Sequence, residues 1–122
     1  MQKQRLVLVF YDIGLNLFCK QFPDPEKIIE DAEKSNVVCI LTGTDRRENE
    51  KIDTFTRTHH AYGTVGIHPH NADSAKQEDF LRMEELAAGN EKIVAIGECI
   101  ILDFHYFTPF SPIYKKQIYF HS

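Results

Sequence analysis

The apolar residues of this chain gather in four short runs separated by charged segments. The runs are rich in Val, Ile and Leu, and they predict strands near residues 6–12, 37–42, 61–67 and 92–98. A continuous apolar run without alternation is typical of a strand in a parallel sheet that is covered on both faces. We therefore expect the first run, LVLVFYD, to be buried on both faces.

The segments between these runs have helical spacing. Helices are predicted over residues 23–36, 45–57 and 77–88. In the last segment Phe80, Met83 and Leu86 recur every three residues, and Gly89 follows as a stop signal. Strands that alternate with helices indicate a parallel sheet built from right-handed βαβ units.

The pattern leaves two architectures open, an open doubly wound sheet and part of a (β/α)8 barrel. No Walker loop or dinucleotide-binding glycine motif occurs along the chain. With 122 residues the chain predicts one domain, residues 1–122.

Charge and composition narrow the class of protein. A formal net charge of -4 argues against a dedicated nucleic-acid binder, although bound divalent cations allow an acidic site to handle phosphodiesters. No run has the roughly 20 apolar residues of a membrane span, and the N-terminal run is too short for a signal peptide, so we expect a cytoplasmic protein with no membrane partner. The three cysteines lack metal-ligand spacing and are expected to be reduced.

Polar residues recur where the predicted strands end. They are Asp12 and Asn16 after the first, Thr42 and Thr44 after the second, His68 and His70 after the third, and Glu98 after the fourth. In a parallel barrel these ends meet at one mouth, where the active sites of barrel enzymes lie. This convergence favours a reaction centre over four unrelated turns.

Four motifs together resemble the TatD family of metal-dependent deoxyribonucleases. They are YDIGLNL at residues 11–17, LTGT at 41–44, VGIHPH at 65–70, and VAIGEC with LDF at 94–99 and 102–104. The resemblance implies the first half of a (β/α)8 barrel of the metal-dependent hydrolase type. It also implies 3′–5′ exonucleolytic hydrolysis of DNA, on single strands or 3′ ends, with one or two divalent ions, Mg²⁺ being expected.

The resemblance assigns roles to particular residues. Glu98 is the expected metal ligand and catalytic residue, and His68 is its catalytic partner, in contact with metal-bound water or the scissile phosphate. Asn16 and Asp12 match the first-strand positions near the metals, in the branch of the family with D-x-G-x-N there. A satisfied carboxylate at the strand end explains Asp12 equally well.

Two residues are expected to bind substrate. His70 would cap its turn or bind phosphate, and Arg46 would position the nucleic-acid backbone. An ordinary solvated helix start explains Arg46 as well.

Two departures from the family pattern bear on activity. The family's G-E-x-G-L-D reads GECIILD here, so Ile100 and Ile101 displace a glycine and leave the position of Asp103 open. The second departure is length, since a complete barrel needs about 250 residues and the later strands carry two further metal-binding histidines of the family. His121 follows Glu98 too closely for a helix and a strand to lie between them, so it is not expected to replace one of these histidines.

Three accounts of whether the chain is catalytically active therefore stay open. In the first, the chain is an active nuclease whose half-barrel self-associates or pairs with a complementing partner. In the second it is an inactive copy of a nuclease, and in the third it is a binding and interaction module. A barrel hydrolase acting on another ester or amide is a rival within the enzyme class.

Overall fold

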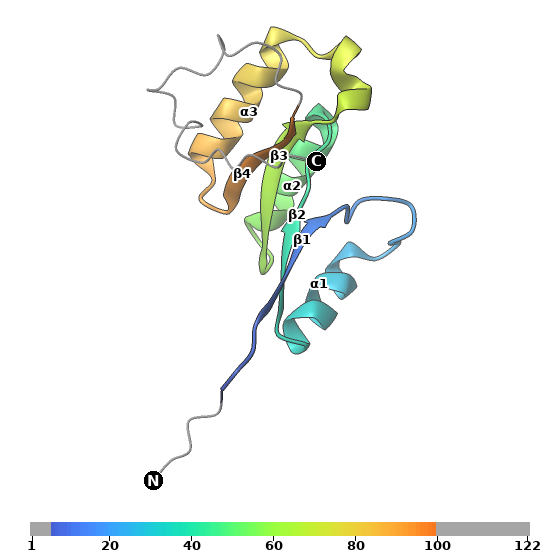
Figure 1. Cartoon of the computed structure of the whole chain (residues 1–122), viewed down its shortest axis with the longest axis vertical. Coiled ribbons are helices and arrows are strands. Elements are labelled where there is room, and N and C mark those ends of the chain that lie inside the picture. The colour runs from blue at the N-terminus through green and yellow to red at the C-terminus, as the bar shows by residue number, and fades with distance from the viewer. Residues whose placement is uncertain (1–5, 100–122) are drawn as a thin grey trace.

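The computed structural model describes residues 6–99 as one parallel sheet with helices between its strands. The strands are β1 (Phe10–Leu15), β2 (Val37–Leu41), β3 (Ala61–Ile67) and β4 (Ile93–Cys99). The helices are α1 (Pro25–Lys34), α2 (Arg46–Thr56) and α3 (Gln77–Gly89), and a 3-10 helix, η1, covers Pro69–Ser74 (Figure 1). The parallel βα repeat predicted from the sequence is confirmed. The predictions on Ile100, Ile101, Asp103 and His121 lie outside the described residues.

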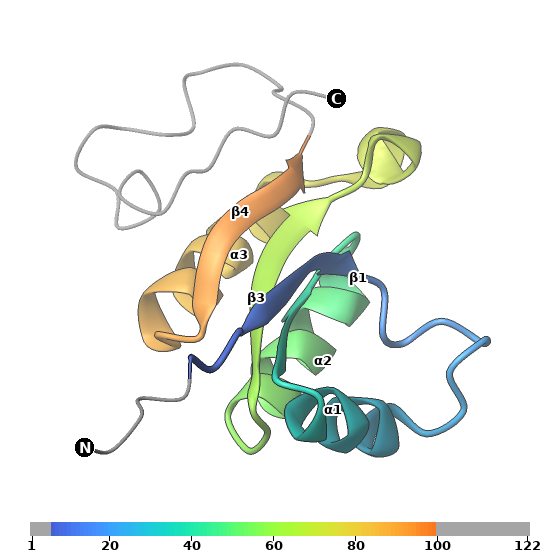
Figure 2. The same ribbon diagram turned by 60° about the horizontal axis from the view of Figure 1, so that its bottom comes forward.

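The strand order decides between the two architectures that the sequence leaves open. The strands lie in the order β1-β2-β3-β4, every neighbouring pair is parallel, and all three helices pack with the strands in one core. In Figure 2, α2 and α3 lie behind the strands. A doubly wound sheet carries helices on both faces and reverses its strand order, whereas a barrel adds each strand beside the last and keeps its helices outside. The arrangement is that of a partial (β/α)8 barrel.

The core lies between the sheet and the three helices. Ile52 of α2, Val65 of β3 and Met83 of α3 are each almost completely buried in it. Burying an apolar side chain of this size contributes about 1.5–3 kcal/mol to the stability of the folded state. The apolar side chains along each helix, packed against one face of the strands, therefore hold the helix layer on the sheet.

Side chains that precede the helices start α1 and α2 where the sequence predicts. Asp24 accepts a hydrogen bond from the Lys27 amide and Asp45 from the Glu48 amide, at 3.1 and 2.8 Å. Each carboxylate satisfies one of the amides that a helix leaves unpaired in its first turn.

The first strand differs from its prediction in position and in burial. It begins at Phe10 rather than near residue 6, because Phe10 pairs with Val37, the first residue of β2, and earlier residues have no partner there. Phe10, Tyr11 and Ile13 are 61, 64 and 58% exposed, so the prediction of burial on both faces is wrong. In the described part of the chain β1 is an edge strand, with a neighbour on one side only.

Candidate functional site at the carboxyl edge of the sheet

The loops that follow β2 and β3 are joined through one backbone carbonyl. The carbonyl oxygen of Thr44 accepts a hydrogen bond from the His68 amide at 2.7 Å and from Asn71 Nδ2 at 3.1 Å. Thr44 and His68 both follow their strands closely, as predicted. The polar residues after β2 and those after β3, two of the four predicted groups, therefore lie together at the carboxyl edge of the sheet.

The two histidines are arranged as a pair. Their rings meet edge to face with centroids 4.7 Å apart, and the His70 amide donates to His68 Nδ1 at 3.1 Å. Because Nδ1 accepts this bond, the neutral His68 ring carries its proton on Nε2. A proton at Nε2 suits contact with a phosphate oxygen or a water oxygen, whereas a metal ligand needs an unprotonated nitrogen.

Glu98 lies in the strand next to these histidines. It is the residue before the last in β4, and the pairing of Ile67 with Cys99 puts it beside the end of β3. The structure describes its backbone position but not its side chain.

A buried polar network beneath the surface links α2, the loop after β2, and the strands β3 and β4. Thr64 Oγ1 donates to the Gly97 carbonyl at 2.7 Å and accepts from the Gly43 amide at 3.3 Å. Asn49 holds the backbone of Gly66 from both sides, through its Nδ2 at 3.0 Å and its Oδ1 at 3.1 Å. These bonds fix the strand ends that precede His68 and Glu98.

Sequence reasoning missed this network. Its signal is polar residues at positions that the apolar pattern assigns to the core, since Asn49 and Thr64 are 2 and 6% exposed. Gly43 belongs to the network as well. A Cβ atom there would lie 2.0 Å from Asn49 Oδ1 and 2.7 Å from the Thr64 carbonyl oxygen, so the close packing requires a glycine.

The first strand brings one of its two predicted residues to the same edge. Asn16 directly follows β1, and the Leu15 carbonyl accepts from the Thr42 amide at 3.0 Å. A bulge at Gly14, with φ of +99°, lies just before this point and requires the conformational freedom of glycine.

Asp12 is not at the end of β1, contrary to prediction, because the strand continues to Leu15. It pairs in register with Cys39, whose side chain is buried in the core between sheet and helices. Burial raises the pKa of the Cys39 thiol, and the nearby negative charge of Asp12 raises it further. Asp12 therefore lies on the side of the sheet that faces the helices.

The predicted metal donors suit a hard cation by their chemistry. Carboxylate and amide oxygens, as in Asp12, Asn16 and Glu98, are the ligands that Mg²⁺ prefers. Among the side chains that the structure describes, which do not include that of Glu98, no three from His, Cys, Asp or Glu come close enough to hold a metal ion.

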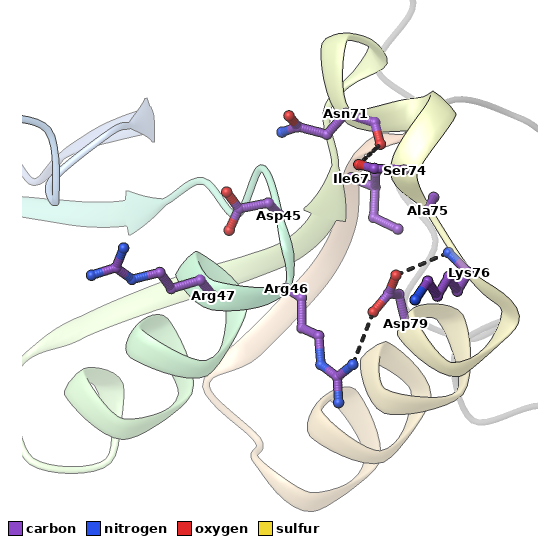
Figure 3. Close-up of a pocket in the computed structure, with 9 residues that line it drawn as sticks. All are labelled: Asp45, Arg46, Arg47, Ile67, Asn71, Ser74, Ala75, Lys76 and Asp79. Atoms are coloured by element: carbon purple, nitrogen blue, oxygen red, sulfur yellow. Dashed lines mark hydrogen bonds and ion pairs between the residues drawn. The ribbon is translucent and has the colours of Figure 1, made fainter.

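Arg46 is the first residue of α2, and its side chain extends toward Asp79 of α3. It lies in a groove of about 340 Å³ between the starts of α2 and α3, where its Nη1 lies 3.4 Å from Asp79 Oδ1 (Figure 3). Asn71 also lines this groove. The groove thus adjoins the histidine loop without being part of it.

Comparison with known proteins identifies the family. A family model described as TatD related DNase matches residues 11–121. The chain belongs to this family. The resemblance found in the four motifs is confirmed, and it covers most of the chain.

Members of the TatD family with assigned activity share clear identity with the chain. The protein named 3'-5' ssDNA/RNA exonuclease TatD from Cronobacter sakazakii is 41% identical over 98 residues, which cover 78% of this chain and 36% of that protein. The proteins of the same name from Pantoea sp. and Erwinia tasmaniensis are 37 and 36% identical over 99 residues, with 78% of this chain and 37 and 38% of theirs covered. The chain spans little more than a third of the length of these TatD relatives.

One further property follows from the helices themselves. None of those within residues 6–99 has the length and apolar character needed to cross a membrane.

Proposed function

We propose that the chain carries part of a metal-dependent nuclease site that hydrolyses phosphodiester bonds of DNA from a 3′ end. The observation that carries the proposal is the His68–His70 pair at the carboxyl edge of a TatD-family sheet, beside the strand end that bears Glu98. The names of the relatives, which specify 3′–5′ exonucleases of single-stranded DNA and RNA, support the substrate class.

The proposed roles follow from the chemistry of each side chain. His68 donates from Nε2 to a phosphoryl oxygen or to the attacking water, and its ring is held in this tautomer by the His70 amide. His70, exposed beside it, binds phosphate, and Arg46 contacts the backbone of the strand.

Glu98, Asn16 and Asp12 are the residues proposed to hold a divalent cation, with Mg²⁺ as the expected ion. When bound, such an ion supplies a water that is nucleophilic at neutral pH and stabilises charge on the phosphoryl oxygens. Glu98 is the principal ligand in this proposal. Asp12 is the weakest of the three, because its register places it on the helix side of the sheet.

The test compares Glu98→Ala with Glu91→Ala in the 122-residue chain. Glu91 is an exposed carboxylate just before the other end of β4, so its loss makes the same change of charge away from the site. We expect release of nucleotides from single-stranded DNA with Mg²⁺, its loss on addition of chelator, and a decrease of at least about a hundredfold in Glu98→Ala alone.

Two results would contradict the proposal. Release that is unchanged in Glu98→Ala would exclude the assigned site. No release from a chain shown by circular dichroism to be folded would favour the alternative of an inactive, binding or interaction protein, and hydrolysis of other esters or amides but not of DNA would favour the rival hydrolase.

A further inference from the structure

The groove between α2 and α3 gathers positive charge in a chain of formal net charge -4. Arg46, Arg47 and Lys76 line it, together with two acids, Asp45 and Asp79 (Figure 3). Both acids are already engaged within the protein. Asp45 accepts from the Glu48 amide, and Asp79 accepts from the Lys76 amide at 2.9 Å and lies beside Arg46.

The cations are less engaged than the acids. In residues 6–99 the side chains of Arg47 and Lys76 form no ion pair, and Arg46 is 60% exposed with one nitrogen at 3.4 Å from Asp79. The groove also lies at the start of two helices, α2 of 11 residues and α3 of 13. A helix N-terminus carries about half a positive charge, which adds to the field of the side chains.

The groove is continuous with the histidine loop. Asn71, one of its lining residues, donates from its side chain to the Thr44 carbonyl, and its amide donates to the His68 carbonyl at 2.8 Å. A polyanion bound at the histidine pair therefore has a cationic surface beside it.

We propose that this groove binds an internucleotide phosphate of a single nucleic-acid strand, one or more nucleotides away from the bond at the histidine pair. The nine lining residues include no aromatic ring on which a base would stack, so the groove recognises the backbone and not the sequence. The inference rests on the proposed function for its substrate class, and it adds a binding site separate from the reaction centre.

Binding in the presence of chelator tests this groove without hydrolysis. We would measure the affinity of labelled oligothymidylate by fluorescence anisotropy over a range of salt concentrations, for the 122-residue chain, for Arg47→Ala with Lys76→Ala, and for Lys34→Ala. Lys34 is an exposed lysine at the end of α1, away from the groove, and its variant shows the effect of losing one positive charge outside the groove.

We expect the double variant to bind roughly tenfold more weakly, with a salt slope smaller by about 0.7 for each phosphate that the side chains no longer neutralise. Lys34→Ala should match the unchanged chain. An unchanged affinity and slope in the double variant, an equal loss in Lys34→Ala, or no binding by the unchanged chain would each overturn the inference.

Two further measurements separate the ligand sources and the two proposals. Inorganic phosphate and thymidine monophosphate are titrated as competitors, and an oligonucleotide that binds no more tightly than either would make the groove a free-phosphate site and overturn the assignment to a strand. Loss of binding in the double variant, together with absence of metal-dependent hydrolysis, would support the groove while contradicting the proposed reaction. Unchanged binding in the double variant, together with hydrolysis that needs Glu98, would support the proposed reaction and contradict the groove.

Discussion

At the scale of single residues, the arrangement of the candidate site depends on backbone groups and on one buried hydroxyl. His68 owes its tautomer to the amide of His70, and its place to the Thr44 carbonyl. Thr64, almost completely buried, connects the backbone of Gly43 to that of Gly97. A hydroxyl in the core thus fixes the spacing of the strands that carry the candidate site.

Replacing Thr64 by valine tests this connection. Valine keeps the shape but leaves the Gly43 amide and the Gly97 carbonyl without their partner, so we expect the free energy of unfolding to fall by about 1–3 kcal/mol. Urea unfolding at room temperature measures the change. Thr64→Ser is the control, since it keeps the hydroxyl and loses only one buried methyl group, about 0.8 kcal/mol. A serine variant less stable than the valine variant would contradict the assigned role.

At the scale of elements, α2 and α3 are connected on the surface as well as through the core. Arg82 of α3 donates to Glu50 of α2 twice, from Nε at 2.6 Å and from Nη2 at 3.0 Å. These hydrogen bonds lower the pKa of the Glu50 carboxyl. Both side chains are about 40% exposed, so screening by solvent limits how much this ion pair stabilises the folded state.

The pH dependence of stability should report this ion pair. A carboxyl whose pKa is lowered by folding stabilises the folded state above its unfolded pKa, and that contribution is lost as the pH falls through the folded pKa. We expect Glu50→Gln to cost about 0.5 kcal/mol at neutral pH. The difference from the unchanged chain should begin to shrink near the unfolded pKa of about 4.3 and be lost once the pH is below the lower, folded pKa. Urea unfolding across pH measures this, with Glu30→Gln, at an exposed glutamate of α1, as the control for the loss of one negative charge. A difference that is constant with pH would exclude the ion pair as its cause.

Element boundaries were predictable where local sequence decides them. Asp24 and Asp45 precede the two helices that they start, and the three later apolar runs became strands within one residue of their predicted ends. The start of the first strand was not predictable in this way. It depends on which residues of β2 are available for pairing, and that register involves residues far apart in the sequence.

At the scale of the whole molecule, the three helices share one core with the sheet, and within the described part of the chain β1 has a neighbouring strand on one side only. Large apolar side chains are exposed along this edge strand and just before it, from Leu6 at 88% to Ile13 at 58%. An apolar edge strand of this kind is a template for pairing with another chain.

We expect the 122-residue chain to self-associate in a concentration-dependent manner through β1. The double variant Tyr11→Lys with Ile13→Lys places charge on the exposed strand and should weaken association by roughly tenfold or more, about 1.4 kcal/mol. Leu81→Lys is the control, because Leu81 is an isolated apolar residue of α3 that is 52% exposed. Sedimentation equilibrium measures the association. A monomer at all concentrations, or an equal effect of Leu81→Lys, would contradict the prediction.

The sequence by itself determined the family, the alternation of strands and helices, and the polar residues that follow β1, β2 and β3. These properties are local, because apolar runs, capping residues and short motifs are each contained in a few neighbouring positions. Only the tertiary structure decided that the sheet is built like part of a barrel, that Asp12 faces the helices, and that Asn49 and Thr64 connect the strand ends. Each of these depends on register and on packing between distant segments, which the order of residues alone does not fix.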